Sequence, residues 1–122
     1  MSIYLVLLVG IGGAVGSIFR YILAEALISF SPWVTVFINT LGGFVIGFGY
    51  RFTVDMSSLE PIRAFLIIGL CGGFTTFSTF GLDFFHLLKN EQIFFGILYI
   101  CSSVIGTILA VYLGIRSVEL FS

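Results

Sequence analysis

Glycine, hydroxyl and aromatic residues follow one another in an otherwise apolar stretch of this chain. Two adjacent glycines, Gly72 and Gly73, precede the run Phe74-Thr75-Thr76-Phe77-Ser78-Thr79-Phe80. Glycine and β-branched threonine are weak helix formers, so the run predicts a helix break inside an apolar segment. The alternative is an unbroken helix whose hydroxyls bond back to the preceding turn. Because a break frees backbone N–H and C=O groups that need partners, it would mark a binding site.

Other polar side chains also interrupt the apolar stretches. Asn39 carries an amide that either donates to a ligand or bonds a neighbouring helix. Tyr99, Ser103 and Thr107 recur every four residues and so share one helix face, which either lines a path or bonds across helices. Arg20 can reach a membrane interface along its apolar stem. Polar groups in such surroundings are costly, which makes all of them candidates for function.

The elements that must position these residues are membrane helices. Hydrophobic residues make up 59% of the 122 residues and charged residues only 9%, whereas a soluble domain has roughly 25% charged residues. Crossing a bilayer takes about 17 to 25 mostly apolar residues. Four runs meet this requirement, at residues 3–23, 33–50, 61–88 and 93–115. We therefore predict an all-α membrane protein, one domain over residues 1–122, with four transmembrane helices and a break in the third.

The basic residues at the span ends give little preference for either orientation. Arg51, Arg63 and Arg116 lie on the side of the termini, against Lys89 and Arg20 on the other side. Because a Lys and Arg excess sets orientation, so weak a bias favours a chain that inserts both ways and forms an antiparallel dimer. A single orientation is the alternative. Small residues spaced four apart allow close helix packing, within one chain or between two: Gly12 and Gly16, Gly43 and Gly47, Gly69 and Gly73, and Gly106, Ala110 and Gly114.

The sequence lacks the common catalytic and metal-binding motifs. Cys71 and Cys101 both fall inside spans, which does not suit a disulfide framework or a CxxC metal site. His86 is the single histidine. There is no phosphate-binding loop, cluster of His and Glu ligands or nucleophile with a neighbouring base. We therefore do not expect an enzyme, and nothing indicates a nucleic-acid partner.

Three stretches match the motifs of a known family in order along essentially the whole chain. They are Gly12-Gly13-Ala14-Val15-Gly16-Ser17-Ile18-Phe19-Arg20-Tyr21, Asn39-Thr40-Leu41-Gly42-Gly43-Phe44-Val45-Ile46-Gly47, and the run from Gly72 to Phe80. The Thr-Thr-Phe-Ser-Thr-Phe string is the most specific of these. In its motifs, length and number of spans the sequence resembles the Fluc fluoride channels, also called the CrcB-like family.

This resemblance implies a multi-pass channel of the cell membrane that exports fluoride passively as a dual-topology, antiparallel homodimer. Asn39 would donate its amide to fluoride, and Phe77 and Phe80 would present ring edges, which are electropositive. The whole implied pathway comprises Arg20, Asn39, Phe77, Ser78, Thr79, Phe80, Tyr99, Ser103 and Thr107. The resemblance also implies a structural sodium ion between the subunits, held by the backbone carbonyls of Gly72 and Thr75.

One residue departs from the family pattern. Asp83 stands where many members have a glutamate, three residues beyond the second phenylalanine, so the carboxylate has a shorter side chain.

Two other classes of protein are alternatives to a channel. A small dual-topology exporter of organic cations needs a carboxylate at membrane depth, for which Asp83 is the only partial candidate. A non-conducting membrane subunit explains the glycines but not the hydroxyl-rich run.

Overall fold

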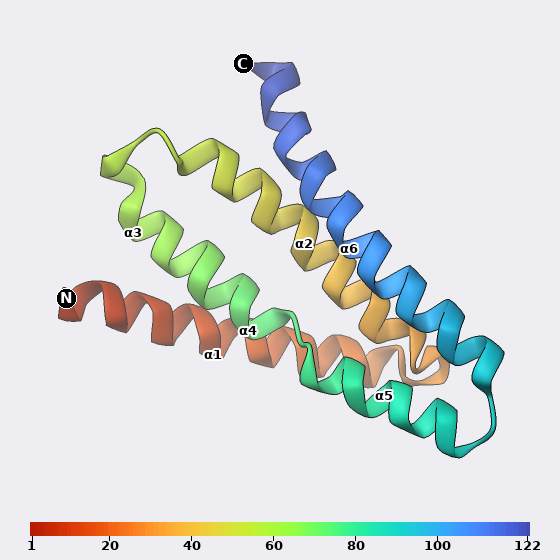
Figure 1. Ribbon diagram of the computed structural model, residues 1–122. Coiled ribbons are helices and arrows are strands. Elements are labelled where there is room, and N and C mark those ends of the chain that lie inside the picture. Colours follow the sequence, from red (N-terminus) through yellow and green to blue (C-terminus); the bar gives the residue numbers. More distant parts are fainter.

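Four long apolar helices make up the chain. The computed structural model describes residues 1–122, and its helices α1 (Ile3–Ala26), α2 (Trp33–Thr53) and α6 (Ile93–Phe121) are each continuous (Figure 1). A composite helix over Ser57–Lys89 is the other apolar element long enough to cross a membrane. The prediction of an all-α protein with four membrane helices is confirmed. The helices α1, α2 and α6 are each longer than predicted. They end at Ala26, Thr53 and Phe121, whereas the predicted ends are residues 23, 50 and 115.

The third span is assembled from short pieces that differ in their backbone. They are η2 (Ser57–Leu59), α3 (Glu60–Arg63), the π-helical η3 (Ala64–Cys71), α4 (Gly72–Phe74) and α5 (Ser78–Lys89). Residues 75–77 belong to no helix, and Thr75 is extended with φ −80° and ψ 158°. The ribbon steps sideways between α4 and α5 at this point (Figure 1). Glycine and threonine before Ser78 suit this local geometry because neither favours the helix strongly.

Helix α1 packs against η3 and α4 through glycines on both sides of the contact. A Cβ added to Gly12 would lie 2.9 Å from the Leu70 nitrogen, and one added to Gly69 would lie 2.7 Å from the Val9 oxygen. These distances are too short for any side chain, so the two backbones touch. In lipid, where no hydrophobic force joins helices, such close contact supplies the attraction. These small residues therefore pack helices within one chain.

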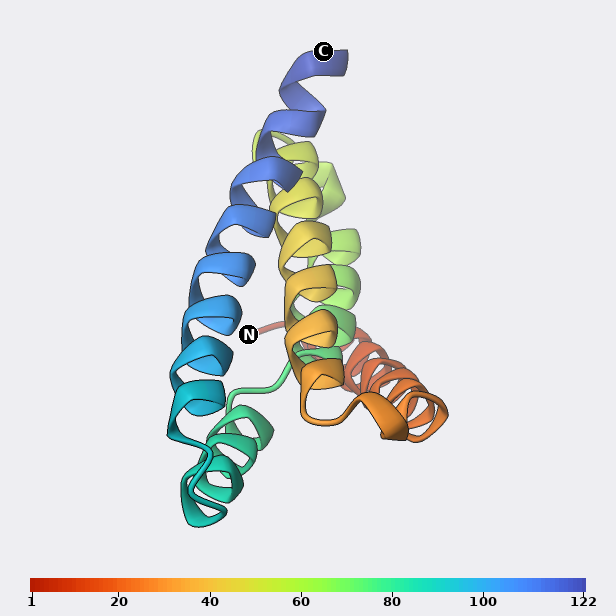
Figure 2. The same ribbon diagram turned by 90° about the vertical axis from the view of Figure 1, so that its right-hand side faces the viewer.

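Helix α2 packs in the same manner against α6. A Cβ on Gly43 would lie 3.1 Å from the Thr107 oxygen, and one on Gly114 would lie 2.7 Å from the Phe48 nitrogen. Figure 2 shows α6 alongside α2, with α1 on the far side of the third span. At the other end of α6, Gly96 makes room for the ring of Phe84 on α5. The fold thus consists of two glycine-packed helix pairs, and α5 joins the second pair.

Charged side chains tie the helices together at the end that carries the C-terminus. Arg51 lies 2.8 Å from Asp55 and 3.7 Å from Glu119, which also pairs with Arg116 at 2.8 Å. Arg63 donates to the Thr53 carbonyl at 2.6 Å and so caps the last turn of α2. Each basic residue at this end therefore has a partner on the protein. Partly exposed pairs of this kind add little stability individually.

Replacing Gly16 by alanine should destabilise the α1 contact. The added Cβ would collide with the Leu70 carbonyl and lie 2.8 Å from the Phe74 nitrogen. Overpacking of this kind typically costs about 1–3 kcal/mol. Thermal unfolding in detergent should show a lowered midpoint for Gly16→Ala. Gly10→Ala is the matched control on the same helix, because its Cβ would meet nothing within 4 Å. Equal midpoints for the two variants would contradict the backbone contact.

Candidate functional site

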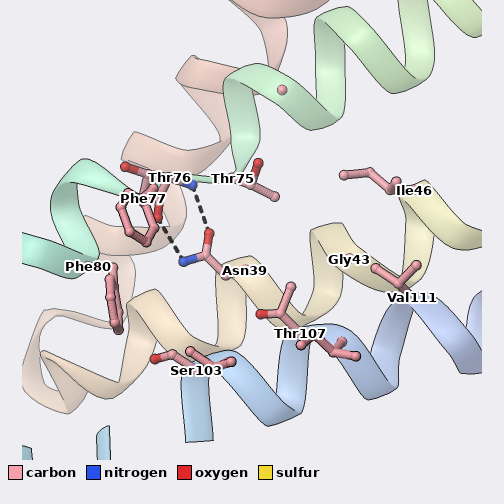
Figure 3. Close-up of a pocket in the computed structure, with 13 residues that line it drawn as sticks. Asn39, Gly43, Ile46, Thr75, Thr76, Phe77, Phe80, Ser103, Thr107 and Val111 are labelled. Carbon is pink, nitrogen blue, oxygen red and sulfur yellow. Dashed lines mark hydrogen bonds between the residues drawn. The ribbon is translucent and has the colours of Figure 1, made fainter. Parts of the chain in front are cut away.

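A groove of about 480 Å³ opens where α2, the third span and α6 meet. Seven of the predicted site residues line it, namely Asn39, Gly72, Thr75, Phe77, Phe80, Ser103 and Thr107. Its remaining lining residues are Gly43, Ile46, Thr76, Val104, Ile108 and Val111. Figure 3 shows the polar side chains grouped around Asn39, with apolar Ile46 and Val111 farther along the groove. No ionisable side chain lines the groove, so its polarity comes from amide, hydroxyl and backbone groups.

The side chain of Asn39 pairs with the peptide groups of Thr76. Its Oδ1 accepts from the Thr76 N–H at 2.7 Å, and its Nδ2 donates to the Thr76 carbonyl at 2.8 Å (Figure 3). The Thr76 N–H requires an acceptor, which fixes the orientation of the amide. An amide NH₂ carries two hydrogens, so one N–H of Asn39 has no acceptor in the protein. Asn39 therefore anchors the non-helical segment and keeps a donor free.

The backbone carbonyls of Gly72 and Thr75 are among those in the third span that lose their helical hydrogen bonds. In a continuous α-helix, Gly72 would accept from the Thr76 N–H and Thr75 from the Thr79 N–H. The first N–H bonds to Asn39 instead, and the second bonds to the Thr76 hydroxyl at 3.2 Å. No group of His, Cys, Asp or Glu side chains could hold a metal ion. A cation at this place would meet only backbone and hydroxyl oxygens, which suit hard cations.

Three aromatic rings form a column along one side of the groove. Phe77 and Phe80 stack with centroids 5.5 Å apart, and Phe80 stacks on Tyr99 at 5.4 Å with an angle of 15° between the planes. The negative faces of the rings are thereby turned toward one another, while their positive edges point outward around the column. Phe77 is 84% exposed. The column can therefore present ring edges to an anion in the groove.

Tyr99 supports this column from behind and does not line the groove. It is completely buried, and its hydroxyl donates to Oδ2 of Asp83 at 2.8 Å. The shorter arm of Asp83 thus reaches across from α5 to α6. Of the predicted stripe on α6, only Ser103 and Thr107 face the groove. Ser103 lines the groove, and its buried hydroxyl has no hydrogen-bond partner on the protein.

The hydroxyls of Ser78 and Thr79 gather around Thr76 and stay outside the groove lining. Thr76 Oγ1 lies 3.4 Å from Ser78 Oγ, donates to Thr79 Oγ1 at 3.2 Å and accepts from the Thr79 N–H. This last bond is the one made by an N-capping residue, so Thr76 closes the first turn of α5. Thr76 was not among the predicted site residues, although its spacing from Thr79 is that of a cap. Arg20, on α1, is half-buried and makes no hydrogen bond or ion pair.

Known sequences match this chain over nearly its full length. Residues 7–115 match the family described as CrcB-like protein, Camphor Resistance (CrcB). The chain belongs to the CrcB-like family. It is 43% identical over 115 residues to the fluoride-specific ion channel FluC of Rhizobium meliloti, covering 90% of this chain and 92% of that protein. The fluoride-specific ion channel FluC of Chlorobium chlorochromatii is 40% identical to this chain over 116 residues. The match covers 92% of this chain and 90% of that protein.

Every residue of the groove lies inside the stretch that matches the CrcB-like family. A third relative, the fluoride-specific ion channel FluC of Leptospira interrogans, is 41% identical and covers 94% of each chain. The groove therefore belongs to the part of this CrcB-like protein that its relatives share, and not to an added segment.

Substituting Asn39 in this CrcB-like protein should loosen the non-helical segment. Asn39→Leu removes both bonds to Thr76, and Asn39→Asp places a carboxylate oxygen against the Thr76 carbonyl. Leaving a buried polar group unpaired costs about 1–3 kcal/mol. Both variants should unfold at lower temperature in detergent, and the Thr76 amide should exchange its hydrogen faster. Asn90→Asp, at an exposed loop position, is the control. Unchanged exchange at Thr76 would contradict the anchoring role.

Proposed function

We propose that this chain is one subunit of a fluoride-selective channel of the cell membrane, through which fluoride leaves the cytoplasm passively. The observation that carries the proposal is a groove with several hydrogen-bond donors and ring edges but no ionisable side chain. The relatives named fluoride-specific ion channel FluC, about 40% identical over most of the chain, support it. The channel would lower the cytoplasmic concentration of fluoride.

The chemistry of the groove fits a small, strongly hydrated anion. A selective path must replace the water that the ion loses on entry. The free N–H of Asn39, the unpaired hydroxyl of Ser103 and the edges of Phe77 and Phe80 would supply that replacement. An exporter of organic cations would instead need a proton-exchanging carboxylate in the groove. The Asp83 carboxylate is bonded to Tyr99 and lies outside the groove lining.

The working unit that we propose is an antiparallel homodimer. In the single chain, Gly72 and Phe77 are exposed beside irregular backbone. Lipid does not satisfy freed backbone groups, so this face needs a protein cover. A second copy of the chain is the simplest cover. Arg51, Arg63 and Arg116 lie on the side of the termini and only Lys89 and Arg20 lie on the other side. This small excess of basic residues gives little preference for either orientation, which favours insertion both ways.

A structural sodium ion between the two copies is part of the proposal. The carbonyls of Gly72 and Thr75 have lost their helical donors, and both residues line the open groove. Two antiparallel copies would bring four such oxygens together near the two-fold axis. Bound there, the cation would offset part of the electrostatic cost of bringing an anion into the membrane. Each copy would hold the ion through the main-chain carbonyls of Gly72 and Thr75.

Reconstituted protein should release fluoride from liposomes without measurable chloride release. Phe77→Ile and Phe80→Ile should each slow fluoride release about tenfold, because losing about 1.4 kcal/mol of stabilisation by a ring edge slows a rate by that factor. Fluoride and chloride electrodes provide the measurement. Phe85→Ile is the control, since Phe85 is exposed on the same helix as Phe80 and does not line the groove. Comparable chloride release, or wild-type rates in both groove variants, would contradict the proposal.

The dimer proposal predicts that one gene product occupies both orientations. A reporter fused to the C-terminus should therefore be accessible from both sides of the membrane. Adding lysines to the loop at residues 54–56 should move most chains to one orientation, and fluoride release should fall as antiparallel pairs become scarce. Chemical labelling of the reporter in intact and opened cells measures the two populations. A native reporter found on one side only, or full release from the one-sided variant, would rule out the antiparallel arrangement.

A further inference from the structure

Trp33, the only tryptophan of the chain, does not line the groove but contacts Tyr99 of the aromatic column. It is the first residue of α2. Its ring meets the ring of Tyr99 nearly edge-on, with centroids 5.8 Å apart and planes at 69°. The side chain is 36% exposed and makes no hydrogen bond, so the contact with Tyr99 is its only specific interaction. Neither the aromatic column nor the polar groups of the groove account for this residue.

Contacts from two other helices hold the ring of Tyr99 in place. Asp83 on α5 accepts its hydroxyl at 2.8 Å, and Phe80 on α5 stacks on its face at 5.4 Å. Trp33 on α2 is the third contact. The hydroxyl bond fixes one end of the ring but allows rotation about its long axis. A tryptophan ring set across the tyrosine ring opposes that rotation, because tilting Tyr99 would bring the two rings into collision.

The direction of the Phe80 ring depends on this tilt. Phe80 and Tyr99 are only 15° from parallel, so a rotated Tyr99 ring would no longer lie flat against Phe80 unless the Phe80 ring turned as well. Phe77 in turn stacks on Phe80 at 5.5 Å. Four rings thus connect the start of α2 to the most exposed ring of the groove. The orientation of a ring determines whether its positive edge or its negative face meets an anion.

We propose that Trp33 is a positioning residue of the ion pathway, which sets the direction of the Phe80 and Phe77 edges through Tyr99. The proposal rests on the proposed function, since it assigns Trp33 a part in fluoride conduction. The competing explanation is that Trp33 serves only as an interfacial anchor, a common role of tryptophan at helix ends in membranes. The two explanations differ in what they predict for the rate of fluoride release. A positioning role requires an aromatic ring at residue 33, whereas an interfacial anchor has no direct effect on the rate.

Fluoride release from liposomes separates these explanations. Trp33→Leu should slow release about two- to tenfold, the range that corresponds to one edge-to-face aromatic contact, and Trp33→Phe should restore most of the rate by returning a ring. Phe30→Leu, at an exposed aromatic three residues earlier, should leave the rate unchanged. Adding Trp33→Leu to Phe80→Ile should cause little further loss, because both changes act on the same column. Equal rates for wild type and Trp33→Leu, or additive losses in the double variant, would overturn the proposal.

The fluorescence of Trp33 tests the ring column without any ion flux. Phe80→Ile should shift the emission of this single tryptophan to longer wavelength, because Tyr99 loses its stacking partner and packs less closely against Trp33. Phe85→Ile, on the same helix but outside the column, should leave the emission unchanged. If wild-type protein conducts no fluoride, the proposed function fails while this shift still reports on the column. An emission that does not respond to Phe80→Ile would overturn the coupling of the rings.

Discussion

The paired hydrogen bonds between Asn39 and the peptide of Thr76 hold together a segment that could not otherwise exist in a membrane. Hydrocarbon offers no water to satisfy backbone groups, so non-helical residues at that depth need partners from the protein. Asn39 supplies a donor and an acceptor from a neighbouring helix. The Thr76 hydroxyl then caps α5, which can begin in a new direction. One amide side chain thus allows the third span to change course.

The non-helical segment between α4 and α5 connects two separately packed halves of the molecule. Upstream of residue 75, the third span packs on α1 through Gly69 and Gly73, whose missing side chains let the backbones touch. Downstream, α5 packs on α6 near Gly96. The groove lies at the junction of these halves, and residues from α2, the third span and α6 reach it. The junction explains why polar groups concentrate there, since only there does irregular backbone need them.

Much of this organisation could be predicted from the sequence, because its signals are local and strong. Apolar runs gave the four spans, and residues far apart in sequence, such as Asn39, Phe80 and Ser103, do line one groove. Other features depend on tertiary packing that no spacing reveals. Tyr99 shares a helix face with Ser103, yet Asp83 and Trp33 draw it away from the groove. Thr76 could have been recognised by its capping distance from Thr79, whereas the π-helical turn of η3 had no recognisable sequence signal.

The π-helical stretch from Ala64 to Cys71 has a consequence for the evolution of the family. A π turn closes on the residue five positions earlier, whereas an α turn closes on the residue four positions earlier, so it accommodates an extra residue per hydrogen-bonded turn. The stretch is therefore a place where an insertion or deletion can be absorbed by exchanging one kind of turn for the other. Gly73 and the residues that begin at Thr75 follow this stretch, so they can keep their places relative to one another when its length changes. A one-residue insertion or deletion should therefore disturb the fold least in this part of the third span.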